Sequence, residues 1–233
     1  MHPASGYQTR HDACDVLDTH RHDAAYAALV LDGSHVEASA DGPIACTPGT
    51  LVLHPRWHAH GNRFGRQGAK VVNVELDTAP ARLHVLRVPD LREAAEVFVR
   101  APQRLAELLA ACEVASAPSL PAWQVEFLSA LEHDELAMTE LARRAGVSLA
   151  HASRSFLKSH GMPPQLLRRE LRCRRALALL GGDASLAQIA ADSGFADQSH
   201  LSRSLREATG NTPSRLRRQI KCVQDANPRA AVQ

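Results

Sequence analysis

Histidine is concentrated at the front of the chain, where eight of the thirteen histidines precede residue 61. His20 and His22 are two residues apart, and so are His58 and His60. Since alternating residues of a strand point to the same side, each pair could share one face. Imidazoles that converge from two strands can bind Zn²⁺ or another borderline divalent metal. They can equally hydrogen-bond the polar groups of a pocket that takes an organic ligand, so both uses remain open.

A second group of candidate residues lies in a segment that occurs twice, at an offset of 48 residues that becomes 49 after one insertion. The matches pair Ala142 with Ala190, Gly146 with Gly194, Ser153-Arg154-Ser155 with Ser202-Arg203-Ser204, Gly161 with Gly210, Pro164 with Pro213, and Leu167-Arg168-Arg169 with Leu216-Arg217-Arg218. Each copy reads as a helix, a tight turn and a second helix. This pattern is typical of the DNA-binding helix-turn-helix.

The turn of each copy contains a glycine that can end the first helix and a polar residue that can cap the second. Gly146 and Gly194 can take the left-handed conformation that ends a helix, and Ser148 and Asp197 can cap the helix that follows. Between the copies, residues 166–180 read as a connecting helix whose arginines lie mostly on one side, which would add to a positive surface.

The second helix of each copy has an apolar face and a polar face. The apolar residues, expected to be buried, are Ala152, Phe156 and Leu157 in the first copy and Leu201 and Leu205 in the second. The residues expected off that face are Ala150, Ser153 and Arg154, and Ser199, His200 and Arg203. Arginine can bind guanine through two hydrogen bonds. A single exposed arginine is more often a solvated charge, but two in register within a duplicated unit favour DNA contact.

The formal net charge of +2 hides two opposed halves. Residues 1–132 carry a balance of −5 and residues 133–221 a balance of +7, which makes the second half a candidate for a polyanionic partner. The first residues contain no apolar run of a secretory signal, and no apolar stretch approaches the length of a membrane span. The five cysteines are scattered, with no C-x-x-C pair. We therefore expect a cytoplasmic protein with reduced thiols and no membrane partner.

The sequence pattern changes from strand-like to helix-like near Asp90. Residues 14–78 contain apolar runs (27–31, 49–53 and 70–76) separated by turn signals at Asp32-Gly33, Asp41-Gly42-Pro43 and Gly61-Asn62, which suggests a sandwich or barrel of short strands. Residues 91–101, 103–115 and 122–133 have the apolar spacing of helices. Their leucines, among them Leu105, Leu108 and Leu109, suit either a dimer interface or packing against the barrel.

Residues 134–219 closely resemble the DNA-binding domain of the AraC/XylS family of bacterial transcription regulators. The resemblance rests on Ile189-Ala190, Gly194-Phe195, Asp197 to Arg203, Gly210, Pro213 and Arg217, and in the first copy on Leu141-Ala142, Gly146, Ser148, Ser153-Arg154, Phe156 and Gly161-Met162. It implies seven helices, with the two second helices about one DNA turn apart in the major groove. It also implies base contacts by Ala150, Ser153, Arg154, Ser199, His200 and Arg203.

The front of the chain resembles the two motifs of cupin barrels, which form the sensor domain of many AraC-type regulators. The matching residues are His20, His22 and Gly33 for the first motif and Gly49, Pro55 and His60 for the second. The resemblance implies metal ligands at His20, His22 and His60, while the acidic ligand of the family falls at Tyr26 and two of its glycines at Cys14 and Trp57. His54, His58 or Cys14 could add ligands, and Tyr26 and Trp57 are expected in an effector pocket.

These observations together predict a two-domain chain, in which an all-β cupin-like barrel with linker helices precedes an all-α domain with two helix-turn-helix units. The expected parts are an effector-sensing or metal-sensing domain (1–80), a linker and dimerisation region (81–132), the DNA-binding domain (133–221) and a tail (222–233). The predicted function is sequence-specific transcription regulation, commonly activation, with a small molecule or a divalent metal as effector. Promoter DNA, RNA polymerase and a second copy of the chain are the expected partners, and no catalytic residue is assigned. Two alternatives are a cupin metalloenzyme that carries a DNA-binding domain and an architectural DNA binder whose front part only dimerises.

Overall fold

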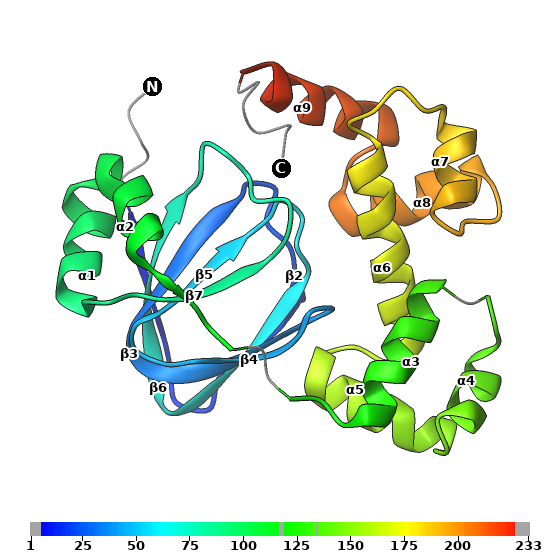
Figure 1. Ribbon diagram of the computed structural model, residues 1–233, viewed down its shortest axis with the longest axis horizontal. Helices are drawn as coiled ribbons and strands as arrows, with labels where there is room; N and C mark the ends of the chain where they lie inside the picture. The colour runs from blue at the N-terminus through cyan, green and yellow to red at the C-terminus, as the bar shows by residue number, and fades with distance from the viewer. Residues whose placement is uncertain (1–5, 117–118, 134, 227–233) are drawn as a thin grey trace. The chain divides into compact units, whose positions relative to one another are not determined.

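The computed structural model describes residues 6–116, 119–133 and 135–226 (Figure 1). The chain forms two compact units, Met1–Ser119 and Leu120–Gln233. The predicted linker and dimerisation region, residues 81–132, is therefore divided between the two units. The last helix continues to Ala226, beyond the predicted domain end at residue 221, and the rest of the predicted tail lies outside the described residues. No helix in the described part of the chain has the length and apolar character needed to cross a membrane.

The first unit is built on one antiparallel sheet, which in the described residues has eight strands. The strands are β1 (Tyr7–His11), β2 (Val16–His20), β3 (Tyr26–Ser39), β4 (Gly42–Cys46), β5 (Thr50–His54), β6 (His60–Glu75), β7 (His84–Arg87) and β8 (Glu113–Val114). The main path runs β1-β6-β3-β5-β7-β8, with β2 also paired to β6 and β4 to β3. The predicted all-β front domain is thus present, followed by a helical domain.

Two of the predicted turns are wrong, because β3 and β6 are long strands that run through them. Asp32-Gly33 lies inside β3, where the pairing with β6 shifts register on both sides of the dipeptide and Gly33 has a φ of 71°. A bulge of this kind bends a strand without ending it. Gly61-Asn62 lies at the start of β6. The expected turn at Asp41-Gly42 does separate β3 from β4. Because of the bend, the sheet wraps around its own interior (Figure 1).

The outer face of this sheet is covered by two short helices, α1 (Leu91–Arg100) and α2 (Leu105–Ala111), joined by the 3-10 turn η1 (Pro102–Arg104). Leu108 is buried in the core with Phe98, while Leu105 and Leu109 pack partly buried against the same cluster. Packing on the sheet therefore accounts for the leucine stripe. The predicted helix over 103–115 ends early, because Cys112 is extended and residues 113–114 pair with β7 as β8.

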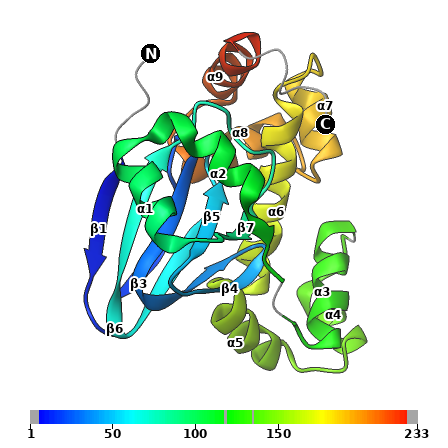
Figure 2. The same cartoon turned by 60° about the vertical axis from the view of Figure 1, so that its left-hand side comes forward.

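The second unit is helical throughout its described residues. Its helices are α3 (Ala122–His133), α4 (Met138–Arg144), α5 (Leu149–His160), α6 (Pro164–Leu179), α7 (Leu186–Asp192), α8 (Gln198–Thr209) and α9 (Pro213–Ala226). The long helix α6 connects the α4–α5 pair to the α7–α8 pair, as both views show (Figures 1 and 2). The predicted all-α domain with two helix-turn-helix units is confirmed.

The sequence duplication is also a duplication of structure. α4 and α7 both have seven residues, and α5 and α8 both have twelve. Ser148 and Asp197 cap α5 and α8, each accepting a hydrogen bond from the backbone N–H three residues later. Gly146 and Gly194 have φ values of 69° and 76°, as the turn requires. The two second helices are therefore fixed by the same local devices.

Candidate functional site

The first candidate surface is the exposed side of α5. Ala150 and Arg154 are exposed and Ser153 is half-buried, while Ala152 and Phe156 are fully buried, as expected. The prediction that Leu157 is buried is wrong, since the side chain is 54% exposed. A step of one residue turns an α-helix by about 100°, which carries Leu157 off the face that Phe156 defines.

The equivalent surface on α8 has the same plan. Ser199 and Arg203 are exposed, and Leu201 and Leu205 are buried. His200 is half-buried, with its ring edge-on to Phe195 at a centroid distance of 5.2 Å. Its position is fixed by the backbone N–H, which donates to Asp197 Oδ1 at 2.7 Å. The structure thus places Ser199, His200 and Arg203 on the first turns of one helix.

Arg154 and Arg203 are both exposed on the second helix of their copy. In the part of the chain that the structure describes, neither guanidinium forms a salt bridge. Arg203 does act on the capping residue Asp197, whose pKa is lowered first by the backbone N–H of His200 and more weakly by Arg203. Both arginines therefore present an exposed cation on the outer side of a second helix.

Several arginines of the connecting helix α6, which the sequence suggested would form a positive surface, instead make contacts within the domain. Arg168 donates to the carbonyl of Leu136 at 2.8 Å, Arg172 pairs with Glu135 at 2.6 Å, and Arg175 donates to the carbonyl of Glu132 at 2.9 Å. These contacts hold the segment that leads into α4. Much of the positive charge of α6 is therefore committed to contacts within the domain.

The same attachment is repeated in the second copy. Arg217, which matches Arg168, donates to the carbonyl of Ala184 at 2.6 Å. Lys221 matches Arg172 and pairs with Asp183 at 2.7 Å. Ala184 and Asp183 stand where Leu136 and Glu135 stand in the first copy. Each helix-turn-helix is thus fastened at its entrance by two basic residues of the helix that follows it.

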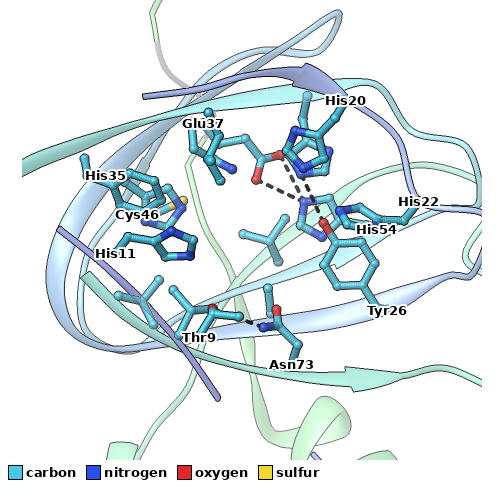
Figure 3. Close-up of a pocket in the computed structure, with 18 of the residues that line it drawn as sticks. Thr9, His11, His20, His22, Tyr26, His35, Glu37, Cys46, His54 and Asn73 are labelled. Atoms are coloured by element: carbon cyan, nitrogen blue, oxygen red, sulfur yellow. Dashed lines mark hydrogen bonds and ion pairs between the residues drawn. The ribbon is translucent and has the colours of Figure 1, made fainter. Parts of the chain in front are cut away.

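The second candidate site is a cavity of about 140 Å³ inside the bent sheet of the first unit (Figure 3). His20 at the end of β2, His22 just beyond it and His60 at the start of β6 all line it. His20 and His60 are direct cross-strand partners with ring centroids 4.5 Å apart. One nitrogen from each of the three rings lies within 4.8 Å of the others. The structure thus brings together the three histidines that the cupin resemblance implies as ligands.

The other predicted residues have different places. Tyr26 and His54 line the cavity and stack with ring centroids 4.3 Å apart. Cys14 is exposed and does not line the cavity, and neither does Trp57, which is buried against other parts of the unit. Trp57 instead fixes the path of the chain around His22, since the backbone N–H of Trp57 donates to the His22 carbonyl at 2.7 Å. Tyr26 is therefore placed to contact a ligand and Trp57 is not.

Glu37 is a buried acidic residue of the cavity that the sequence interpretation missed. It lies in β3 beyond the bulge, is 3% exposed, and contacts His54 Nε2 through its two oxygens at 3.1 and 3.0 Å. Side-chain alternation along a strand could have identified Glu37. Residues 35, 37 and 39 share one face of the sheet only when β3 is a continuous strand, and the turn expected at Asp32-Gly33 hid that pattern. His58 completes this region, with its Nε2 2.9 Å from Asp41 Oδ2.

Burial favours the neutral form of His60, and the neighbouring imidazoles favour the ionised form of Glu37. Burial lowers the pKa of His60 to about 3, so the ring is neutral. Burial and the nearby Glu37 carboxylate raise the pKa of Tyr26 far above its usual value, so its hydroxyl keeps its proton and donates to His60 Nε2 at 3.1 Å. Burial opposes ionisation of Glu37, but the charge of His54 and its hydrogen bond lower the pKa of Glu37 below its usual value. Neutral imidazoles and a carboxylate are the donor set that transition metals prefer.

The size of the cavity limits its occupant. Sites for drug-sized ligands commonly enclose about 300–1,000 Å³, whereas this cavity has about 140 Å³. A space of that order is enough for a molecule of roughly benzene size. The cavity therefore fits a metal ion or a small organic ligand with polar groups, and both possibilities of the sequence interpretation remain chemically suitable.

The second unit is similar to known helix-turn-helix domains. A helix-turn-helix domain model matches residues 141–219. A transcriptional regulator with an AraC-type DNA-binding domain from Chromobacterium violaceum is 30% identical, covering 42% of this chain and 91% of its own, with a TM-score of 0.39. The DNA-binding domain of AdpA, solved in complex with a target DNA, is 25% identical over 47% of this chain and 99% of its own, with a TM-score of 0.42.

Solved structures of ToxT from Vibrio cholerae match along nearly the whole chain. ToxT from Vibrio cholerae, bound to an unsaturated fatty acid, is 12% identical over 92% of this chain and 95% of its own, with a TM-score of 0.42. No curated protein matches the chain. The helix-turn-helix domain at residues 141–219 and its duplicated structure place the chain among the AraC-type DNA-binding transcription regulators, whose partner is double-stranded DNA.

Proposed function

We propose that the protein regulates transcription by placing α5 and α8 in successive segments of the major groove of its operator. The observation that carries this proposal is the structural duplication, in which two helices with the same caps expose an arginine at the same position. The base-contacting residues would be Ala150, Ser153, Arg154, Ser199, His200 and Arg203. Residues near the N-terminus of a recognition helix are those that reach base edges. Because Ala150 offers only a methyl group, recognition by α5 would depend mainly on Arg154.

We further propose that the cavity of the first unit binds the effector. His20, His22, His60 and Tyr26 would contact it, and the effector is a divalent transition metal or a small organic molecule that hydrogen-bonds to imidazoles. Backbone conformation supports the cupin interpretation of this unit. Cys14 and Trp57, which stand at glycine positions of the cupin motifs, have φ values of 62° and 57°, and Gly33 and Gly49 are also left-handed. As in the family that the sequence resembles, the effector would favour activation, with a second copy of the chain and RNA polymerase as partners.

A transcription reporter tests whether the cavity controls the DNA-binding unit. The expected result is that His20→Ala/His22→Ala changes the induced level of a reporter placed behind the protein's operator, because the variant removes two contacts to the effector. A coupling of 1–3 kcal/mol between two sites corresponds to a change of about 5- to 150-fold. Reporter output and operator affinity would be measured together, so that a loss of DNA binding is not mistaken for a loss of response.

The matched control is His84→Ala, a half-buried histidine of β7 that does not line the cavity. This control should respond as the unmodified protein does. If the double variant and the control give the same response under every growth condition tried, the cavity is not the sensing site.

A further inference from the structure

A second cluster of possible metal ligands lies deeper in the first unit than the predicted set. Glu37, His54, His58 and His60 are all buried, and each can offer one ligand atom within 4.8 Å of the other three. They come from β3, β5, the loop before β6 and the start of β6. The predicted set of His20, His22 and His60 shares only His60 with this cluster.

The distance between Glu37 and His54 suits two neighbouring ligands of a small tetrahedral ion. Zinc bonds of about 2.0–2.1 Å to nitrogen place neighbouring ligand atoms roughly 3.3–3.4 Å apart. His54 Nε2 already lies 3.0 Å from Glu37 Oε2. An ion could therefore replace this hydrogen bond with movements of a few tenths of an ångström. The cluster offers three nitrogens and one oxygen, a donor set that zinc accepts.

His58 also has the outer contact that metal-binding histidines commonly make. Its Nε2 lies 2.9 Å from Asp41 Oδ2. A ligating histidine usually donates its other ring N–H to a carboxylate or a carbonyl, which fixes the ring and raises its basicity. With Nε2 turned toward Asp41, Nδ1 of His58 would be the ligating atom. In His60, Nδ1 faces the carbonyl of His58 at 3.4 Å, so Nε2 would be the ligating atom, and the ion would displace the Tyr26 hydroxyl that now lies 3.1 Å from this nitrogen.

The buried charge of Glu37 and the incomplete hydrogen bonding of His54 both favour a bound cation at this cluster. A buried carboxylate is costly unless it is paired or coordinates a metal. In the described part of the chain no lysine or arginine pairs with Glu37, and its close neighbours are imidazoles. His54 has a buried Nδ1 without a hydrogen-bond partner among the described residues. A structural network would commonly have used both nitrogens, so the His54 ring can exchange its Glu37 contact for an ion without breaking a second hydrogen bond.

We propose that Glu37, His54, His58 and His60 bind one divalent transition metal ion, zinc foremost, in a closed site with four protein ligands. His20 and His22 would then remain on the open side of the cavity, available to a second ligand. The metal site follows from the contacts of the first unit alone. Its use as the inner wall of an effector pocket rests on the proposed function.

Metal content of the full chain, purified without a histidine tag, tests the proposal. The protein would be loaded with zinc, dialysed and measured by elemental analysis. We expect one zinc per chain in the unmodified protein. Glu37→Gln keeps the shape of the side chain and removes the charge, and His54→Ala removes a ligand. Removing an outer-shell partner alone weakens metal binding about 10- to 100-fold, so loss of a direct ligand should weaken it by at least about 100-fold.

Two matched variants make the result specific to the deeper cluster. His20→Ala/His22→Ala should retain the zinc, and so should His35→Ala, a buried histidine that lines the same cavity outside the cluster. Two zinc ions per chain, one lost with each set of variants, would also support the site. Absence of zinc from the unmodified protein would overturn it, as would zinc that is lost in His20→Ala/His22→Ala and kept in Glu37→Gln.

Cobalt replacement provides a measurement that does not depend on how the variants fold. Co²⁺ in the unmodified chain should give the strong visible absorption of a four-coordinate ion, whereas a weak six-coordinate spectrum would contradict a closed site. Operator binding by the same preparations separates the two proposals. If the unmodified protein binds its operator but holds no zinc, only the metal site is overturned. If it holds one zinc per chain but does not bind DNA, only the proposed regulatory function is overturned.

Discussion

Replacing Arg203 with alanine is expected to weaken binding to the preferred duplex by about 5- to 150-fold, equivalent to 1–3 kcal/mol for one bidentate base contact. Arg203 is exposed on α8 and has no salt bridge among the described residues, so its guanidinium can reach DNA without first breaking a contact in the protein. The loss should be largest on the preferred sequence and small on random DNA. Fluorescence anisotropy with both duplexes measures this ratio.

Arg154→Ala should have an effect of the same size, because Arg154 has the equivalent position on α5. The two effects should be roughly additive in free energy, since the residues lie on different helix-turn-helix units with no shared partner. Arg206→Ala is the matched control, an exposed arginine of α8 outside the proposed base-contacting set. If Arg203→Ala weakened binding equally on every sequence, it would be a phosphate contact and not a base contact.

Phe156→Ala is expected to destabilise the second unit by about 3–5 kcal/mol, the usual cost of removing a large aromatic side chain from a core. Phe156 is 0% exposed and packs against Phe127 and Trp123 of α3, with ring centroids 5.1 and 5.8 Å away. The variant would leave a cavity between α3 and α5. Because α5 carries Ala150, Ser153 and Arg154, operator affinity should fall along with stability.

The neighbouring residue supplies the control. Leu157→Ala removes an apolar side chain that is 54% exposed, and changes at such positions are usually within about 0.5 kcal/mol. Urea unfolding followed by the helical circular dichroism signal would compare the two variants. Equal destabilisation by both would show that the face of α5 assigned to the core is incorrect.

The helical unit was largely predictable because its determinants are local. A glycine with positive φ, a capping Ser or Asp and an apolar face can each be read from a few residues, and the duplication allowed each feature to be checked twice. Long-range contacts were not predictable in this way. Arg168 and Arg217 look like surface charges in sequence, but they bind the carbonyls of Leu136 and Ala184 some thirty residues away.

The cavity was predictable only in part, for a related physical reason. His20, His22 and His60 could be grouped from their spacing and the cupin resemblance. Glu37 could not, because Asp32-Gly33 reads equally as a hairpin turn or as a bulge, and only the pairing with β6 decides between them. If Asp32-Gly33 is taken as a turn, the strand ends before Glu37 and nothing places Glu37 beside His54. Similarly, pairing with β7 overrides the helical pattern at residues 113–114.

Selection of binding sites from random duplex DNA by the full chain tests the central proposal most directly. Two helix-turn-helix units joined through α6 should select a bipartite sequence, with half-sites separated by about one helical turn, or about 10 base pairs. Affinity for the selected duplex should exceed that for random DNA by at least about 10³-fold at physiological salt. Selection of no common sequence, or of one short half-site that Arg154→Ala and Arg203→Ala leave unchanged, would contradict the account.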